Sequence, residues 1–536
     1  MKRDDLQLIL MILTTAALAA VVIALSDPFE RNGSVKASFV SEQTYEECTK
    51  GKEKTVFDPS ILRFMGEEVP YDLSSDTVFL PQSLSSDDFS GKFTVAAAGG
   101  RVLLLSGAGE EAPDKADCLS SGRGFKIAVV LKDSYMESTA VFTGLPAVCI
   151  DYEDGEIRGK EVHTGRIRVF DPVRRSCRSF DCSFHMRGST SVMFDKKSYR
   201  VELNDRTGKK LKESLLGLRS DDDWVLNSLG TDKSLAREKV CYDLWKRLGE
   251  MEKDPVPAPA MEYTELFLGG SYMGVYGLMY PVDQKLMGMR PGDLLYKIKT
   301  WKEEVTAPGR LVDYNGLKEV VNTNGVPYAA IEYPEGEEEL YDWGPLQAYQ
   351  DFVFETGDLS TLTEKNIRLD TENFIFHELF CEMTRAGDNT WKNLYLAAYA
   401  DGRGGYVLRE TIWDLNYTFG DAFVYEPEKG NTVFLKDSTD NYKLRYDRDY
   451  GYSTLVVADD DTEPMTSAKW KKWREEGIGP ELVESMFEEN RSVLVKSGAM
   501  DRNEDRWPGS TLPDDSGIAE WIEGRFGFLD SLHGQP

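Results

Sequence analysis

The chain has little histidine, and none of its cysteines forms a Cys-x-x-Cys pair. Only 4 histidines and 7 cysteines occur among 536 residues. A structural zinc site is therefore not expected, and the scattered cysteines do not resemble the framework of a small disulfide-rich domain. The closest pair, Cys177 and Cys182, could bridge a hairpin. Because the total is odd, at least one thiol would be free or paired with another chain.

Basic residues are also in deficit. The sequence has 63 Lys and Arg against 92 Asp and Glu, which gives a formal net charge of -29. Such a surface repels nucleic acid, so we expect no nucleic-acid partner. A polyanionic ligand would need local cations or a metal ion to bind. The hydrophobic fraction of 41% is that of a globular protein with a large core.

One long segment has no charge. Between Asp5 and Asp27 the sequence is almost wholly apolar from Leu6 to Leu25, a length that spans a bilayer core as a helix. Lys2 and Arg3 precede it, which favours a cytoplasmic N-terminus and an exported body. A cleaved signal peptide is the alternative, but its apolar core would be shorter. We therefore expect a single-pass membrane protein, held by this helix, with an extracytoplasmic body.

The remaining patterns predict three parts. Residues 1–27 form the anchor or signal segment, residues 28–122 a tether and small β module, and residues 123–536 a large α+β domain. Within the large domain the patterns predict a strand at 198–203, a helix at 234–248 with Ser234 as its N-cap, a Gly269-Gly270 hairpin between strands at 264–268 and 274–278, a helix at 373–382 and an amphipathic helix near the C-terminus.

The strand at 198–203 carries a candidate anion-binding lysine. Tyr199, Val201 and Leu203 form its apolar face, and extending the alternation backward puts Lys197 on the same side. A lysine there needs an anion, and an internal carboxylate would serve as well as a ligand. Just upstream, the loop from Arg187 to Ser191, with Ser189 among its hydroxyls, has a composition suited to phosphates. An ordinary hairpin turn could look the same.

Two acidic motifs follow farther along the chain. Asp388 and Asn393 have the Asp-x-x-x-x-Asn spacing of a protein-kinase catalytic loop, where the aspartate accepts a hydroxyl proton and the asparagine holds a metal ion. Asp414 comes after an apolar strand end, where a carboxylate could bind magnesium. The alternatives are structural. Asp388 and Asn393 could simply form a turn, and Asp414 could cap a turn or pair with Arg409.

Taken together, several segments resemble the CotH kinase family, named for spore coat protein H. The resemblance covers roughly residues 125 to 535. It implies an atypical protein-kinase-like fold that transfers phosphate from ATP to Ser/Thr hydroxyls of a protein substrate. The matching segments, in the family's order, are 185–191, 196–200, 215–218 with 221–226, 232–237, 272–276, 295–297, 388–393 and 413–420.

The resemblance also implies roles for the candidate residues. Asp388 would be the catalytic aspartate, and Asn393 and Asp414 would hold Mg²⁺ or Mn²⁺. The residues implied to bind ATP are Arg187, Ser189, Lys197 and Lys297.

One departure bears on activity. After the Gly-Val-Tyr hairpin the family usually carries a Thr-Glu pair, where this chain has Met279-Tyr280. If that glutamate orients a lysine or a metal ion, the chain would be a catalytically inactive protein on the same fold. A carbohydrate-binding or wall-associated protein is a further alternative, suggested only by the predicted export and the aromatic content.

Overall fold

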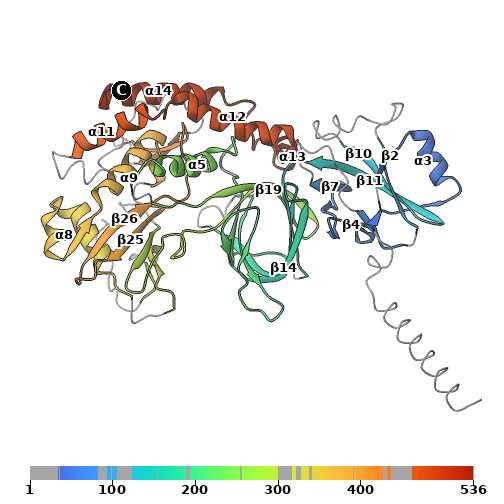
Figure 1. The fold of residues 1–536 in the computed structure, drawn as a ribbon, viewed down its shortest axis with the longest axis horizontal. Coiled ribbons are helices and arrows are strands. Elements are labelled where there is room, and N and C mark those ends of the chain that lie inside the picture. The colour runs from blue at the N-terminus through green and yellow to red at the C-terminus, as the bar shows by residue number, and fades with distance from the viewer. Residues whose placement is uncertain are drawn as a thin grey trace, which may run out of the picture. The chain divides into compact units, whose positions relative to one another are not determined.

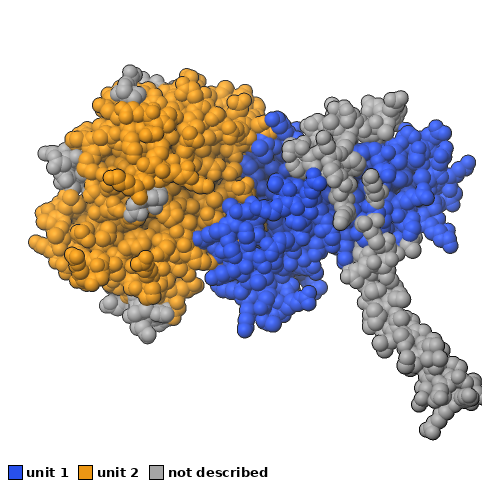
Figure 2. Space-filling model, viewed as in Figure 1, with its two compact units in different colours: residues 1–222, 263–276, 493–508 blue, residues 223–262, 277–492, 509–536 orange. Residues whose placement is uncertain are grey.

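A computed structural model of the chain contains two compact units, which Figure 2 distinguishes by colour. Unit 1 consists of Met1–Asp222, Tyr263–Tyr276 and Val493–Pro508, and unit 2 of Asp223–Glu262, Gly277–Ser492 and Gly509–Pro536. Each unit therefore combines segments from distant parts of the sequence. The residues that the structure describes are 34–35, 37–81, 93–97, 99–105, 124–153, 155–188, 194–253, 256–299, 317–321, 327–336, 341–389, 392–426, 431–435 and 462–534.

The N-terminal part of unit 1 contains two sheets that share one apolar core. Phe79, Phe93 and Phe142 come from both sheets and are almost fully buried in this core. The smaller sheet has the order β1 (Ser34–Val35), β8 (Phe93–Val95), β4 (Leu62–Phe64), β5 (Glu67–Glu68). The larger sheet has the order β2 (Ser38–Phe39), β9 (Arg101–Leu105), β10 (Phe125–Val130), β11 (Ser134–Thr143), β7 (Thr77–Pro81), β6 (Tyr71–Asp72), with β3 (Glu53–Thr55) beside β11 and helix α3 (Glu42–Thr49) against β9.

A closed barrel of seven strands follows, which the sequence patterns did not predict. The predicted alternation of its fourth strand is confirmed, because every second side chain from Tyr199 to Leu203 is buried. The Gly269-Gly270 hairpin is also confirmed, and both glycines have the positive φ that such a turn favours. The barrel order is β12 (Ala147–Asp151), β13 (His163–Asp171), β14 (Ser176–Arg187), β15 (Ser198–Asn204), β18 (Asp223–Asn227), β20 (Ser271–Met279), β19 (Met261–Leu268).

The cysteine pair that could have bridged a hairpin does not do so. Cys177 and Cys182 lie on the same strand, β14, and both thiols are free. Residues five apart on an extended strand are too distant for a disulfide, which needs Cα atoms within about 7 Å.

Unit 2 contains a mixed sheet covered by helices. Helix α9 (Thr371–Thr384) packs against β26 of this sheet and against α11 (Thr462–Glu475) and α14 (Ser516–His533), as Figure 1 shows. Asp370 accepts a hydrogen bond from the backbone N–H of Asn373 at 3.3 Å and so caps the start of α9. The sheet order is β22 (Glu319–Val321), β23 (Pro327–Tyr333), β21 (Leu294–Ile298), β25 (Leu394–Ala400), β26 (Tyr406–Thr411), β24 (Ile367–Leu369).

Smaller elements complete the described chain. These are the pair β16 (Glu213–Ser214) and β17 (Ser220–Asp221), the pair β27 (Ala422–Glu426) and β28 (Asn431–Leu435), and helices α7 (Gly344–Asp351), α8 (Ser360–Glu364), α12 (Pro480–Lys496) and α13 (Ala499–Arg506).

The helix predicted at 234–248 exists but begins later. Helix α5 spans Arg237–Gly249, and its apolar side chains, including Leu244 and Leu248, are buried as expected. Ser234 is not the cap. The carboxylate of Asp232 accepts the backbone N–H of Arg237 at 2.8 Å and that of Ser234 at 2.9 Å. An aspartate outside the predicted helix therefore satisfies the first N–H group of α5, that of Arg237.

The predicted localisation, a single-pass membrane protein, is not supported by the structure. No helix within the described ranges is long and apolar enough to cross a membrane. Even α14, with 18 residues, carries Glu520, Glu523, Arg525 and Asp530, and charged side chains are costly in a bilayer core. The predicted anchor at residues 6–25 lies outside the described residues. The fold class is thus mixed α+β with several sheets and a barrel. The prediction that it also includes a transmembrane helix is not supported by the described residues.

Candidate active site

Asp388 lies in a short helical turn just after α9, and its carboxylate is buried. Gly387–Asn389 forms the turn, and Asp388 is only 3% exposed. Asn393 donates from Nδ2 to Asp388 Oδ2 at 3.0 Å, and Lys392 Nζ lies 3.4 Å from Oδ1. The two residues picked out by the Asp-x-x-x-x-Asn spacing are therefore in direct contact.

Burial disfavours the charged form of the Asp388 carboxylate, and its neighbouring residues offset this effect only in part. Burial raises the pKa of Asp388 to about 7, Lys392 opposes this rise, and the neighbouring Asp414 carboxylate adds to it. Within the described part of the chain, the partner of Oδ1 is the Lys392 ammonium group at 3.4 Å, which is long for a charge-assisted hydrogen bond. Buried polar atoms are normally satisfied, so this atom suits a proton donor or a cation that binds from outside the chain.

Asp414 lies on the loop that follows β26, beside the Asp388 turn. Asn389 connects the two, because its Nδ2 donates to the carbonyl oxygen of Trp413 and lies 3.4 Å from that of Asp414. Asp414 is half-buried. The predicted alternative partner, Arg409, instead bonds from Nε to Asp370 at 2.6 Å.

The backbone of both proposed metal ligands is unusual. Asn393 has a φ of 58° and Asp414 a φ of 63°, in the left-handed region. Asn and Asp enter this region more readily than other non-glycine residues, and such conformations gather at functional sites. Their neighbours must hold them there.

Lys297, one of the predicted ATP-binding residues, lies beside this loop. It lies on β21, paired with Tyr395 of β25. Its Nζ is 5.1 Å from the ring centroid of Tyr395 and 5.4 Å from that of Trp413. The ammonium group therefore lies over the residue next to Asp414, held by cation–π contacts.

The other predicted ATP-binding residues belong to unit 1. Arg187 ends β14, opposite Ser198 of β15. Lys197 is half-buried and donates to the carbonyl oxygen of Phe194. Ser189 lies outside the described residues. Their role toward ATP stays a prediction.

The buried lysine of this segment is a neighbour that the sequence patterns missed. Lys196 is 5% exposed, and its Nζ donates to the carbonyl oxygen of Val275 at 2.6 Å and to Asn503 Oδ1 at 2.8 Å.

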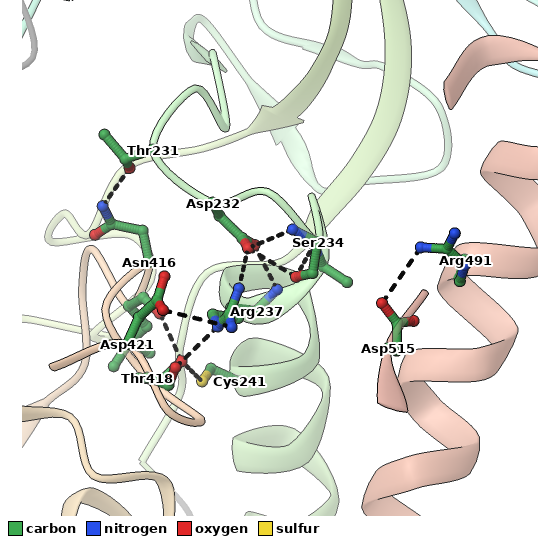
Figure 3. A network of polar contacts seen from close by, with 12 residues as sticks. Thr231, Asp232, Ser234, Arg237, Cys241, Asn416, Thr418, Asp421, Arg491 and Asp515 are labelled. Carbon is green, nitrogen blue, oxygen red and sulfur yellow. Dashed lines mark hydrogen bonds and ion pairs between the residues drawn. The ribbon is translucent and has the colours of Figure 1, made fainter. Parts of the chain in front are cut away.

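Farther along the same loop, a buried ion network joins Thr418 and Asp421 to Arg237 at the start of α5 (Figure 3). Arg237 donates from Nη1 to Asp232 Oδ1 at 2.7 Å and from Nε to the carbonyl oxygen of Thr418 at 2.9 Å. Its Nη2 lies 3.6 Å from Asp421 Oδ1. In the sequence, Asp232, Arg237 and Thr418 were marked only by lying in the family-matching segments 232–237 and 413–420.

The donors at the site fit a magnesium-type ion better than zinc. Across the described ranges, no group of three or more His, Cys, Asp or Glu side chains could hold a metal ion. Magnesium needs only one or two carboxylates when substrate phosphates supply the other oxygens. The Asp414 carboxylate and the Asn393 amide oxygen would make up such a set if both faced the same ion, and the buried Asp388 carboxylate beside them favours positive charge nearby.

One comparison with known proteins gives a match. A family model described as CotH kinase protein matches residues 184–527. This range includes every candidate residue from Arg187 to Asp414, and the resemblance seen in the sequence is confirmed. No curated protein matches the chain.

Proposed function

Because the chain belongs to the CotH kinase family, we propose that its kinase-like domain transfers the terminal phosphate of ATP to serine or threonine hydroxyls of a protein substrate. The single observation that best supports the proposal is the buried contact between Asp388 and Asn393, with the second carboxylate oxygen of Asp388 paired only loosely with Lys392 at 3.4 Å. A turn built only for stability would satisfy both oxygens of a buried aspartate.

In the proposed reaction Asp388 acts on the acceptor hydroxyl. The hydroxyl oxygen forms a bond to the terminal phosphorus while the bond from phosphorus to the leaving ADP oxygen breaks. The hydroxyl proton passes to Asp388 Oδ1. A carboxylate whose pKa is about 7 is well matched to accept a proton near neutral pH. Asn393 keeps this carboxylate in place through its bond to Oδ2.

Mg²⁺ or Mn²⁺ would neutralise charge on the transferring phosphate. Asp414 and Asn393 would hold it. Asn393 uses its amide nitrogen on Asp388, which leaves its amide oxygen for the metal ion. Lys297 would meet a phosphate beside this ion, since its ammonium group lies over Trp413. Arg187, Ser189 and Lys197 complete the proposed ATP contacts on the family resemblance alone.

Tyr280 favours a second candidate function. It is buried, with 8% exposure, at the position where the family usually carries a glutamate. A phenol cannot replace a carboxylate toward a metal ion or a lysine at neutral pH. The rival proposal is a kinase-like protein that binds ATP but transfers no phosphate.

The first experiment measures ATP binding by thermal shift. A ligand that binds only the folded state raises the melting temperature. We expect ATP with Mg²⁺ or Mn²⁺ to raise it and ATP with EDTA to have little effect. If ATP shifts nothing with either metal ion, both the kinase and the ATP-binding rival are wrong.

The second experiment separates catalyst from binder. Asp388→Asn keeps the side-chain shape but removes the charge, so transfer from labelled ATP should fall about 10²-fold or more. The ATP-dependent thermal shift should survive. Asp401→Asn is the control, because Asp401 is a turn aspartate that accepts the backbone N–H groups of Arg403 at 2.7 Å and Gly405 at 2.9 Å. Equal activity of both variants would remove Asp388 from the mechanism, and ATP binding without any transfer by the parent would favour the rival.

A further inference from the structure

A buried carboxylate in the first turn of α5 has two hydrogen bonds that fix its orientation. Glu238 is 2% exposed. Its Oε1 accepts the Tyr242 hydroxyl at 2.8 Å, and its Oε2 accepts Asn227 Nδ2 at 2.7 Å. Glu238 and Tyr242 are four residues apart, so they share one face of the helix. The carboxylate therefore holds the tyrosine hydroxyl at a fixed point.

That hydroxyl contacts the loop of the proposed metal site. The backbone N–H of Asp414 donates to the Tyr242 hydroxyl oxygen at 3.2 Å. A tyrosine hydroxyl titrates at about pH 10, well above the neutral range. The hydroxyl therefore keeps its proton, which it donates to Glu238, and its oxygen is free to accept from Asp414.

Asp414 needs such support because its backbone is in the left-handed region, with a φ of 63°. That conformation costs a residue with a Cβ free energy unless its surroundings enforce it. Asn389 Nδ2 lies 3.4 Å from the carbonyl oxygen of Asp414, which belongs to the next peptide group. Tyr242 therefore contacts the N–H side and Asn389 the carbonyl side of a single residue.

We propose that Tyr242, oriented by Glu238, is a positioning residue that sets the place of the Asp414 carboxylate for a divalent cation bound with ATP. The proposal rests on the proposed function. It adds a link from the first turns of α5 to the metal ligand. Glu238 and Tyr242 do not touch the substrate, and they act through the backbone of Asp414.

The test compares Tyr242→Phe with Tyr349→Phe. Tyr349 is also buried in unit 2, and its hydroxyl donates to Glu410 Oε1 at 2.7 Å, on strand β26 rather than on the loop after it. Each variant loses one hydroxyl that bonds to a buried glutamate. Two quantities are measured: the hydrogen-exchange rate of the Asp414 amide, and the Mn²⁺ concentration that half-saturates the ATP-dependent thermal shift.

For Tyr242→Phe we expect both quantities to rise by about tenfold, a change that corresponds to 1.4 kcal/mol and lies near the upper range for one neutral hydrogen bond. Tyr349→Phe should change neither, although it lowers the melting temperature. Glu238→Gln can still accept from Tyr242, so it should recover part of the Mn²⁺ affinity that Glu238→Ala loses.

The outcomes distinguish the positioning role from the proposed function. Unchanged exchange at Asp414 in Tyr242→Phe overturns the positioning role, whatever the protein binds. Faster exchange with unchanged Mn²⁺ dependence also overturns it, because Asp414 would then move without effect on the cation. If the parent protein shows no shift with ATP and Mn²⁺, the proposed function fails, and with it the metal-positioning role. The exchange rate would then show only whether Tyr242 restrains the loop.

Discussion

Replacing Arg237 with methionine should destabilise unit 2 strongly. Methionine keeps much of the length and apolar character of arginine but removes the guanidinium group. Arg237 is 1% exposed, Asp232 is 1% exposed and Asp421 is fully buried, so water cannot replace the lost cation. Breaking a buried ion pair by removing one partner costs about 3–5 kcal/mol. Two carboxylates and the Thr418 carbonyl lose their bond to Arg237 at once, which puts the expected loss at the upper end of that range.

The assay is urea unfolding at pH 7, followed by far-ultraviolet circular dichroism. The control is Lys365→Met in the same unit. Lys365 Nζ lies 3.0 Å from Asp351 Oδ2, but these side chains are 49% and 43% exposed. Surface pairs contribute about 0–1 kcal/mol, so this variant should lose little. Arg237→Lys keeps the positive charge but lacks the planar guanidinium group with its several N–H donors, so it should recover only part of the lost stability.

A double variant tests whether the loss of stability comes from buried carboxylates that are left without a cation. Asp421→Asn removes one carboxylate of the network, and the Arg237→Met cost should fall in that background, because one fewer buried anion is left without its cation. A loss below about 1 kcal/mol for Arg237→Met, or additive losses in the double variant, would refute this account of the network.

Three other predictions follow from the site and its supports. Asp414→Asn should abolish the Mg²⁺ or Mn²⁺ dependence of the ATP thermal shift, and equal ATP binding by this variant in EDTA would exclude Asp414 as a metal ligand. Arg525 is fully buried and donates to the Glu382 carbonyl oxygen at 2.9 Å, near the end of α9 that leads to Asp388. Arg525→Met should therefore lower both the melting temperature and phosphate transfer, and transfer that is unchanged at low temperature would show that this contact is remote from the site. Burial lowers the pKa of His377, but Cys381 and Glu410 outweigh it, so the folded pKa lies well above the ordinary value. The stabilisation from His377 is then complete below about pH 6.5, and it is lost by about 1.4 kcal/mol per pH unit as the pH rises toward the folded pKa. His377→Gln should lack this slope in urea unfolding between pH 6.5 and 8.5, and parallel slopes would contradict the assignment.

Features that depend on neighbouring residues could be predicted from the sequence. The alternation from Tyr199 to Leu203, the Gly269-Gly270 turn and the turn at Asp388 each involve a few consecutive positions. In such segments the backbone period or the turn chemistry decides which side chains meet. The same logic located α9 and α14, whose apolar residues recur with the helical period.

The prediction for Lys197 shows where local reasoning stops. Strand β15 begins at Ser198, so the two-residue period does not reach back to residue 197. The chain enters the strand from a bend, and Lys196 is the buried lysine of the pair. Its partner Asn503 is 307 residues away in the sequence. No residue close to Lys196 in the sequence indicates that the Asn503 side chain is its partner.

The supports of the candidate site were hidden for the same physical reason. Tyr242 and Asp414 are 172 residues apart, and Arg237 and Thr418 are 181 apart, yet each pair is joined by one hydrogen bond. Sequence motifs reveal residues whose chemistry is distinctive, such as Asp388, Asn393 and Asp414. A tyrosine or an arginine on an amphipathic helix looks like ordinary core or surface until the fold brings its partner to it. The left-handed backbone of Asp414 makes those partners necessary, so the chemistry of the motif depends on residues of α5 that carry no motif themselves.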